Sequence, residues 1–340
     1  MKALILAAGL GTRLRPITHL LPKPMLPVFG APLIEHIVAQ LRDQGINRIF
    51  VNLHHMPEKV MTHLQDGGKL GVEIRYSVEP SILGTAGAIK KLEEELGGAP
   101  FLVVNGDTVR PIFLEALLER HRVLGKAVTL LLQEDSQGPD SNSVFLAEGG
   151  EVVGFWSLGT REAPSRLKPC HFLGVQVMEP EVLSLIPPDA FWEAQRLWKE
   201  LLENGMGLAG YCQDGYWKDL GTVDAYLELH RDFLDAKAKG LIPGREVEPG
   251  IWIGENVSIG QEVEITPPVF LGDRTVVGKK SKVGPYAVVG PRSHLGDKSK
   301  AERCIIWPGV RVGPRRVVGQ EILAEGLRIF VPWPKCSLRR

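Results

Sequence analysis

The carboxyl-terminal third of the sequence carries a six-residue repeat. Aliphatic residues recur at every sixth position from Ile253 to Leu295, most of them directly before a glycine, and a small or β-branched residue stands two positions earlier. After Ala301 the spacing slips by one residue and resumes at Ile306, Val312 and Val318. This period is typical of a parallel β-helix built from hexapeptide repeats. We expect a left-handed β-helix with aliphatic side chains inside its flat sides and glycines and small residues at its corners.

The sequence before residue 235 has a different pattern, in which short apolar runs alternate with amphipathic stretches. We expect strands over 3–8, 48–52, 72–77, 101–105 and 127–133, and helices over 32–44, 58–65, 87–96, 112–124 and 223–237. This alternation predicts an α/β, Rossmann-like domain with a mainly parallel sheet, whose ligands lie beyond the carboxyl ends of the strands. The predicted organisation is a first domain over 1–235, a linker over 236–248, the β-helix over 249–330 and a tail over 331–340.

Composition excludes several classes of protein. The 40 Lys and Arg residues equal the 40 Asp and Glu residues, and no long basic run occurs, which argues against nucleic acid or an anionic membrane as partner. The four cysteines are far apart in sequence and form no CxxC pair, so we expect reduced thiols and a cytoplasmic protein. No apolar run approaches the roughly 18 residues that a membrane helix needs.

A glycine-rich loop follows the first expected strand. Gly9 and Gly11 allow backbone N–H groups to approach phosphates, Thr12 adds a hydroxyl, and Arg13 offers a rigid pair of donors. Leu14 occupies the position where a dinucleotide-binding GxGxxG loop has its third glycine, and the lysine of a Walker loop is missing. Taken alone, the loop is also compatible with a glycine turn that binds nothing.

A second motif follows ten residues later. Lys23 stands between Pro22 and Pro24, which hold the backbone extended and stiff. Together, Gly9–Pro16 and Leu21–Val28 resemble the signature of the NTP:sugar-1-phosphate nucleotidyltransferases, also called NDP-sugar pyrophosphorylases. The chain most resembles the mannose-1-phosphate guanylyltransferase branch, whose members carry a β-helix tail.

This resemblance implies a function and a set of site residues. It implies Mg²⁺-dependent transfer of a nucleotidyl group from an NTP to a sugar-1-phosphate, with Arg13 and Lys23 as catalytic residues that bind the triphosphate. It places the metal on Asp107 and Asp219. Apart from the resemblance, we expect the β-helix to mediate assembly into a homo-oligomer through its flat faces or coil ends. The sugar would contact Asn105, Gly106 and Gly174. The nucleotide would contact Leu6, Ala7, Ala8, Gly9, Gly11, Thr12, Arg13, Lys23, Glu79, Gly84, Thr85 and Ala86.

The two aspartates also have structural interpretations. Asp107 ends an apolar run in Val104-Asn105-Gly106-Asp107, where a carboxylate faces the crevice and suits Mg²⁺, but a turn aspartate fits the same place. Asp219 matches a family Trp-x-Asp-x-Gly-Thr motif. It is also a candidate N-cap for the following helix, although Thr222 is better placed for that role.

Glu79 is the residue that bears on the choice of base. It stands in Glu79–Gly87, which resembles the family loop that reads the base edge, where thymidylyl and uridylyl members commonly carry glutamine. A carboxylate only accepts hydrogen bonds, and guanine offers two adjacent donors where uracil and thymine offer one N–H between two carbonyls. Glu79 therefore favours GTP, although some relatives with glutamate here use uridine nucleotides.

One family motif is missing. Many members carry Glu-Lys-Pro, whose lysine holds the sugar phosphate, after the segment that here ends at Phe155; this chain has Trp156-Ser157-Leu158 instead. Lys168 is the nearest lysine in sequence, but its register does not match. The alternatives left open are UTP- or dTTP-dependent transfer to glucose-1-phosphate, a non-catalytic regulatory subunit, an acyltransferase that uses His294, and a metal pair at His54 and His55.

Overall fold

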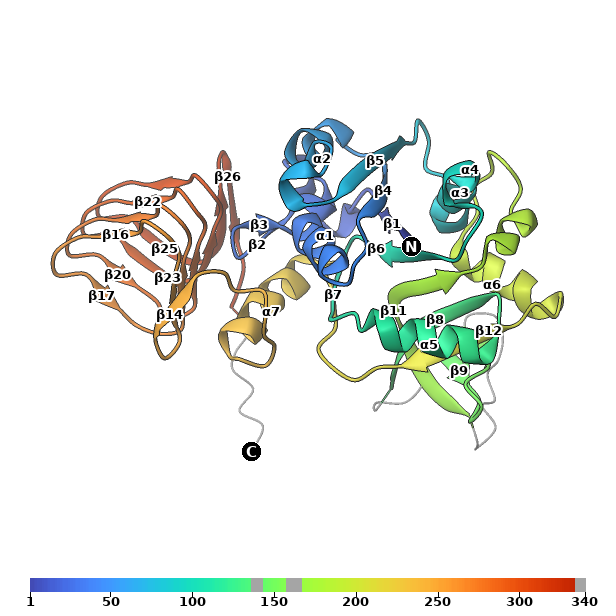
Figure 1. Cartoon of the computed structure of the whole chain (residues 1–340). Helices are drawn as coiled ribbons and strands as arrows, with labels where there is room; N and C mark the ends of the chain where they lie inside the picture. The colour runs from blue at the N-terminus through green and yellow to red at the C-terminus, as the bar shows by residue number, and fades with distance from the viewer. Residues whose placement is uncertain (136–142, 157–166, 334–340) are drawn as a thin grey trace. The chain divides into compact units, whose positions relative to one another are not determined.

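The computed structural model describes residues 1–135, 143–156 and 167–333 (Figure 1). The chain forms two compact units. Unit 1 contains Met1–Gly11, Leu21–Pro24 and Ile37–Asp219, and unit 2 contains Thr12–Leu20, Met25–His36 and Leu220–Arg340. Unit 2 therefore includes two short amino-terminal segments as well as the expected β-helix. The predicted tail lies outside the described residues beyond 333.

Within the described residues, unit 1 is built on a nine-stranded mixed sheet. Its neighbouring strands β6, β1, β4 and β5 are parallel, with β5 at the edge, and β11 joins them antiparallel beside β6. A separate short pair joins β7 to β13. The strands are β1 (Lys2–Leu6), β4 (Arg48–Leu53), β5 (Glu73–Val78), β6 (Phe101–Asn105), β7 (Thr108–Val109), β8 (Val128–Glu134), β9 (Ser143–Leu146), β10 (Val152–Phe155), β11 (Lys168–Met178), β12 (Leu208–Cys212) and β13 (Lys218–Asp219).

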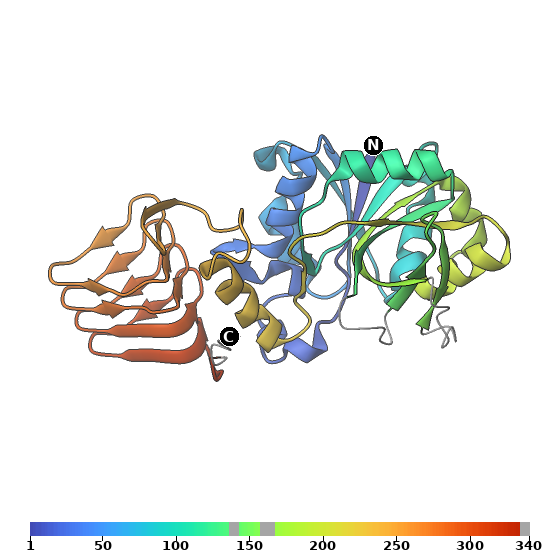
Figure 2. The same ribbon diagram turned by 90° about the horizontal axis from the view of Figure 1, so that it is seen from below.

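Helices cover the sheet. One buried cluster joins Ile89 of α3 and Trp198 of α6 to Leu130 and Leu132 of β8. The opposite side of β8 faces α5 (Figure 2). There the His121 imidazole hydrogen-bonds the Thr129 hydroxyl. Alternate residues of the strand therefore serve two helical layers, as expected for a covered sheet. The helices are α1 (Leu33–Asp43), α2 (Pro57–Leu64), α3 (Gly84–Lys90), α4 (Glu93–Leu96), α5 (Leu114–Leu124), α6 (Ala194–Glu203) and α7 (Val223–Leu234).

These elements confirm the α/β prediction and correct some of its boundaries. The first strand ends at Leu6 rather than at 8, so Ala7 and Ala8 already belong to the loop. The single helix expected over 87–96 is two helices, because Leu92 leaves the helical region with φ −105° and ψ 24°. The helix expected over 223–237 ends at Leu234.

The repeat region of unit 2 forms stacked coils with three flat sides, as Figure 2 shows in orange to red. Corresponding residues pair in parallel at intervals of 18, as in Val269 with Ala287. The next interval is 17, from Ala287 to Cys304, which matches the slip read from the sequence. The strands are β15 (Ile251–Ile253), β16 (Ser258–Ile259), β17 (Glu264–Ile265), β18 (Val269–Leu271), β19 (Val276–Val277), β20 (Lys282–Val283), β21 (Ala287–Val289), β22 (His294–Leu295), β23 (Lys300–Ile306), β24 (Arg311–Val312) and β25 (Val317–Ala324), closed by β26 (Leu327–Phe330).

The repeat has a physical cause at each position. A Cβ on Gly272 or Gly278 would come within about 2.6 Å of the backbone of the next coil, so only glycine fits there. The small residues Ser281 and Ser293 are buried and donate their hydroxyls to carbonyls of neighbouring coils. The aliphatic residues of the inner coils are buried, as expected. Ile259 is 43% exposed instead, because its strand β16 pairs with a coil on one side only.

The expected linker is partly ordered as a strand. Its last residues form β14 (Arg245–Glu248), which pairs antiparallel with β15 and extends the β-helix by one strand. The domain boundaries themselves remain a prediction.

The first flat side of the β-helix carries an outward apolar row that is covered within unit 2. The hairpin of β2 (Pro27–Val28) and β3 (Ala31–Pro32) places Phe29 against Phe270, with ring centroids 5.5 Å apart. Phe29 also contacts Phe233 of α7. The Tyr226 hydroxyl of α7 donates to the Pro27 carbonyl over 2.5 Å. The chain segment that directly follows Lys23-Pro24 is thus packed on the β-helix.

Candidate active site

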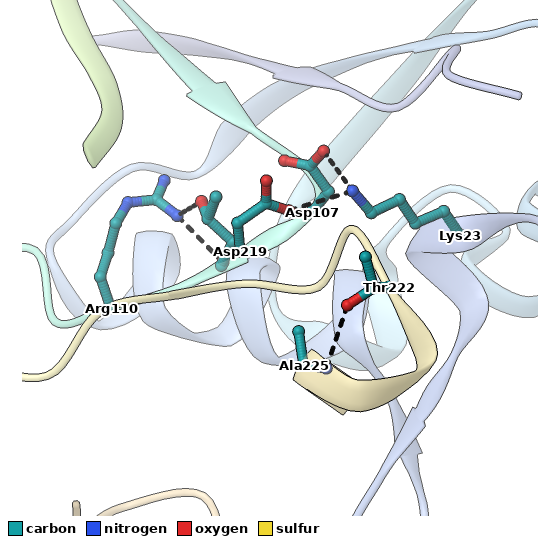
Figure 3. Close-up of polar contacts among 7 residues, drawn as sticks. Lys23, Asp107, Arg110, Asp219, Thr222 and Ala225 are labelled. Carbon is teal, nitrogen blue, oxygen red and sulfur yellow. Dashed lines mark hydrogen bonds and ion pairs between the residues drawn. The ribbon is translucent and has the colours of Figure 1, made fainter. Parts of the chain in front are cut away.

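Lys23 lies between two aspartates that come from distant parts of the sequence. Its ammonium donates to Asp107 Oδ2 over 2.6 Å and to Asp219 Oδ1 over 3.2 Å (Figure 3). The lysine is buried, whereas the aspartate side chains are 35% and 42% exposed. Three of the residues that the sequence singled out are therefore brought together in unit 1, with an open side on the carboxylates.

Local backbone structure explains this convergence. Asp107 follows β6, and the next residue, Thr108, pairs directly with Asp219 in the β7–β13 ladder. The capping prediction is confirmed, because the Thr222 hydroxyl accepts the Ala225 N–H at the start of α7. Asp219 does not act as that cap, so its carboxylate is available for the site.

Arg110 is a buried cation beside the aspartates that the sequence analysis missed. Its guanidinium donates to the carbonyl and hydroxyl of Thr108 and to the Gly174 carbonyl, and its Nε has no hydrogen-bond partner. Burial lowers the pKa of Arg110 to about 9, and the charge of Asp107 opposes that fall. Figure 3 shows Arg110 and Lys23 on opposite sides of the two aspartates. An arginine three residues beyond the aspartate was a usable signal.

The predicted sugar-side residues also meet. Gly174 has φ +76° and lies where the register of β11 shifts against β8, and a Cβ there would come within about 3 Å of the Asn105 side chain. Gly106 donates its N–H to the Leu6 carbonyl over 2.8 Å, and a Cβ would collide with that oxygen. Glycine is therefore required at both positions by close packing, and Asn105 is held between them.

A buried hydrogen-bonded chain joins the phosphate-loop strand to Glu79. The Ala7 N–H donates to Asn52 Oδ1 over 2.7 Å, and Asn52 Nδ2 donates to Glu79 Oε1 over 2.8 Å. The Leu83 N–H donates to Glu79 Oε2 over 3.0 Å. Asn52 is the second residue that sequence analysis missed. An amide near the carboxyl end of the apolar strand β4 was the signal that could have found it.

The expected nucleotide loop after Glu79 is packed against a later segment. Gly84 has φ +72°, and a Cβ there would lie 2.7 Å from the Trp192 carbonyl. That carbonyl accepts the Ala86 N–H over 2.8 Å, so this N–H is already engaged within the protein. The nucleotide contacts predicted for Gly84, Thr85 and Ala86 remain predictions, as do those of Leu6, Ala8, Gly9 and Gly11.

Thr12 and Arg13 belong to unit 2, and both are exposed in a short 3-10 turn. Their roles beside Lys23 remain predictions.

Lys168 is exposed and pairs with Glu134 over 2.6 Å on the surface of the sheet. Of the segment that replaces Glu-Lys-Pro, Ser157 and Leu158 lie outside the described residues.

The aspartates suit a hard cation. Mg²⁺ binds through one or two carboxylates and completes its shell with water and substrate phosphate oxygens. Asp107 and Asp219 supply two such groups, and both already converge on one positive charge, the Lys23 ammonium. Within residues 1–135, 143–156 and 167–333, no group of three or more His, Cys, Asp and Glu side chains is arranged to hold a metal by itself. A site shared with phosphate is therefore the arrangement that these residues fit.

The structure also bears on three other expectations, which concern the thiols, the histidine pair and a membrane helix. Among the cysteines inside the described ranges, Cys170, Cys212 and Cys304 are free thiols, and the sulfurs of Cys170 and Cys212 are 3.6 Å apart. His54 hydrogen-bonds the Glu79 carbonyl through Nδ1. In the part of the chain that the structure describes, no helix is long and apolar enough to cross a membrane.

Comparison with known proteins identifies the family. The nucleotidyl transferase family model matches residues 2–236. A UTP–glucose-1-phosphate uridylyltransferase of Synechocystis is 34% identical, over 76% of this chain and 70% of the relative. A mannose-1-phosphate guanylyltransferase of Mycobacterium tuberculosis is 29% identical, over 77% and 76%.

A solved structure supports the same relationship. A glucose-1-phosphate thymidylyltransferase candidate from Bacillus anthracis superimposes with a TM-score of 0.60 at 25% identity, covering 72% of this chain and 98% of the other. The relatives act on different bases and sugars, so the resemblance to the guanylyltransferase branch does not single out that branch. The matched region contains Lys23, Asp107 and Asp219, and the chain belongs to the nucleotidyl transferase family.

Proposed function

We propose that the protein transfers a nucleotidyl group from an NTP to a hexose-1-phosphate and releases pyrophosphate. GTP and mannose-1-phosphate are the favoured substrates. The observation that supports this function most strongly is the convergence of Lys23, Asp107 and Asp219. Family membership supplies the reaction class, and the named relatives supply the sugar-1-phosphate acceptor.

The chemistry follows from the charges at this site. The acceptor is already an anion, since a sugar phosphate oxygen attacks the α-phosphorus, so the protein needs no covalent intermediate. Lys23 has three ammonium hydrogens, and two bonds to carboxylates leave one to donate to a phosphate oxygen. Together with Arg13, it would neutralise charge on the pyrophosphate as it leaves. Positioning and charge neutralisation are the main contributions that phosphoryl-type transfer requires of a protein.

Asp107 and Asp219 would hold Mg²⁺, which when bound neutralises phosphate charge and orients the reacting groups. The protein's own part is to aim both carboxylates at one point. Lys23 contacts both of them, and the β7–β13 pairing fixes the spacing of their backbones. Chelation of divalent ions would therefore stop turnover and leave the fold in place.

The preference for GTP rests on Glu79. The residue is 2% exposed, and each oxygen of its carboxylate accepts one internal hydrogen bond. An ionised carboxylate has about four acceptor positions, so capacity remains for the two adjacent donors of guanine. Uracil would instead bring a carbonyl toward a negative charge. We expect a discrimination of about 1–3 kcal/mol, as for other bidentate contacts to bases.

UTP-dependent transfer to glucose-1-phosphate is the second candidate. The specific observation in its favour is the 34% identity to the Synechocystis uridylyltransferase. A non-catalytic regulatory subunit is a third candidate, and the presence of the lysine and both aspartates speaks against it.

One experiment separates these candidates. Purified protein is assayed for pyrophosphate with GTP, UTP, dTTP and ATP, each against glucose-, mannose- and N-acetylglucosamine-1-phosphate, in the presence of Mg²⁺. The proposal expects the largest kcat/KM for GTP with mannose-1-phosphate. Preference for UTP with glucose-1-phosphate would select the second candidate, and no turnover in any combination would contradict catalysis.

We also propose a homo-oligomer that works in the cytoplasm. The β-helix supports assembly, because its first coil leaves Ile259 exposed at its open end. Light scattering of the full chain tests this point, and a monomeric mass at micromolar concentration would contradict it.

A further inference from the structure

The chain of hydrogen bonds through Asn52 runs along the carboxyl ends of three neighbouring parallel strands. Asn52 pairs in register with Leu6 of β1 and with Ser77 of β5. It therefore stands between the loop that begins at Ala7 and the loop that begins at Glu79. Asn52 is 3% exposed, so water does not take the place of its hydrogen-bond partners.

The two hydrogen bonds fix which way the Asn52 amide points. The Ala7 N–H is a donor and requires the amide oxygen, at 2.7 Å. The Glu79 carboxylate is an acceptor and requires the amide nitrogen, at 2.8 Å. The opposite orientation would place two donors together and two acceptors together, so both neighbours select the same one.

Neutral donors hold the Glu79 carboxylate in place. One oxygen accepts from Asn52 and the other from the Leu83 N–H, and no cation pairs with it among the described residues. The backbone of Glu79 is also fixed, because its N–H donates to the Leu53 carbonyl and its carbonyl accepts from His54. The side chain therefore depends on Asn52 for one of its two anchors.

We infer that Asn52 is a positioning residue for base selection: it orients the Glu79 carboxylate toward the base and ties that orientation to the Ala7 N–H at the start of the phosphate loop. This inference rests on the proposed role of Glu79. Loss of the amide donor releases one carboxylate oxygen, and the carboxylate then presents its acceptors to a base without a fixed geometry. The effect falls on the choice between bases more than on turnover with a saturating NTP.

The test uses Asn52→Asp, which keeps the acceptor for Ala7 but replaces the amide donor to Glu79 with a second carboxyl group, and Asn52→Leu, which removes both groups. For each variant, kcat/KM is measured for GTP and for UTP at saturating sugar phosphate. We expect the ratio of kcat/KM for GTP to kcat/KM for UTP to change by about tenfold toward a value of one. This is the effect of losing a hydrogen bond to a charged group. Asn47→Asp is the matched control, because Asn47 is exposed at the other end of the same strand, and its ratio stays unchanged.

A double-mutant cycle shows whether Asn52 acts through Glu79. If it does, Asn52→Asp changes the ratio much less in a Glu79→Gln background than in the wild type, because the contact is already altered. Equal effects in both backgrounds, or an unchanged ratio in folded Asn52→Asp and Asn52→Leu proteins, would overturn the inference.

The test of Asn52 can succeed or fail independently of the proposed preference for GTP and of the proposed catalysis. If the wild type prefers UTP, the preference for GTP fails, but the ratio still moves in the variants if Asn52 positions the carboxylate. If no NTP is turned over, the same ratio is measured as Kd for GTP and UTP by calorimetry. Should Asn52→Leu fail to fold, Asn52→Asp and the cycle still decide the question.

Discussion

Lys23 Nζ lies 2.6 Å from Asp107 Oδ2, and the same ammonium is 3.2 Å from Asp219 Oδ1. The lysine therefore occupies the point where the two aspartates converge, which is also where they would bind a divalent cation. On this proposal, the ammonium and a divalent cation would compete for the same carboxylates in the protein without substrates.

Replacing Lys23 by Met should uncouple metal binding from catalysis. Without the ammonium, the carboxylates lose their counter-ion, and we expect affinity for Mn²⁺ in the absence of NTP to rise by about tenfold, since one close charge pair contributes roughly 1–2 kcal/mol. Turnover should fall by at least about 100-fold, the scale of removing one donor to developing charge. Calorimetric Mn²⁺ titration and pyrophosphate release measure the two effects. Lys59→Met, at an exposed position of α2, is the control; unchanged Mn²⁺ affinity in Lys23→Met would contradict the competition.

Gly30 tests the packing of the β2–β3 hairpin on the β-helix. It has φ +91°, and a Cβ there would lie 2.5 Å from Pro291 Cδ. Gly45 has φ +81° and no atom within 4 Å of its Cβ position. Gly45→Ala should cost about 1–2 kcal/mol from the left-handed backbone alone. Gly30→Ala should cost about 1–3 kcal/mol more, because the collision adds to that strain. Equal losses in urea unfolding would mean that the hairpin moves away from Pro291 without penalty.

The buried imidazole of His230 should make the free energy of unfolding depend on pH. It is buried between Tyr226 and Phe29: its Nδ1 donates to the Tyr226 carbonyl, and its Nε2 accepts the Phe29 N–H. Burial, with a smaller contribution from nearby His36, lowers its pKa from 6.5 to about 4, against the hydrogen bond to the Tyr226 carbonyl, which raises it. The unfolded chain therefore binds a proton at higher pH than the folded protein, so this contribution is fully present above pH 6.5 and is lost as pH falls toward 4.

The expected loss between neutral pH and pH 5 is about 2 kcal/mol in the free energy of unfolding, from the difference between a pKa of 6.5 in the unfolded chain and about 4 in the folded protein. His230→Asn keeps a donor for the Tyr226 carbonyl but does not titrate in this range. Urea unfolding at both pH values should show a smaller loss for the variant than for the wild type. A wild-type loss equal to that of His230→Asn would show that His230 does not carry the effect.

Arg110 should affect the sugar half of the site. Its guanidinium joins Thr108, next to Asp107, to the Gly174 carbonyl. Arg110→Met leaves both carbonyls without this donor, and we expect KM for the sugar phosphate to rise by about tenfold, while KM for the NTP changes less than twofold. Steady-state kinetics with each substrate varied in turn measures the two KM values separately. Arg122→Met, exposed on α5, is the control. A parallel rise in both KM values would contradict a role confined to the sugar side.

The β-helix could be predicted because every coil repeats the same local requirement. Glycine is required where a Cβ would come within about 2.6 Å of the next coil, and an aliphatic residue must fill each inner side. The period in the sequence therefore corresponds to the repeat of the coils. Even the slip after Ala301 corresponds to a shorter coil. The exposure of Ile259 could not be predicted, because it depends on the coil that is missing beside it.

The site could be predicted only in part. Lys23 and Asp219 are 196 positions apart, and the ladder that joins Asp219 to Thr108 has two residues on each strand, too short to leave a pattern. The motifs identified the residues, but not the pairing of Lys23 with both aspartates. Asn52 and Arg110 were missed because a single polar residue at a strand end or after a turn has many ordinary explanations, and only its partners give it a role.

The central claim is that Asp107 and Asp219, together with Lys23, form the site of nucleotidyl transfer. The most direct measurement is Mg²⁺-dependent pyrophosphate release from GTP and mannose-1-phosphate by Asp107→Asn, with the thermal midpoint recorded in parallel. The account predicts a loss of at least about 100-fold in kcat with an unchanged fold. Turnover equal to that of the wild type would contradict it.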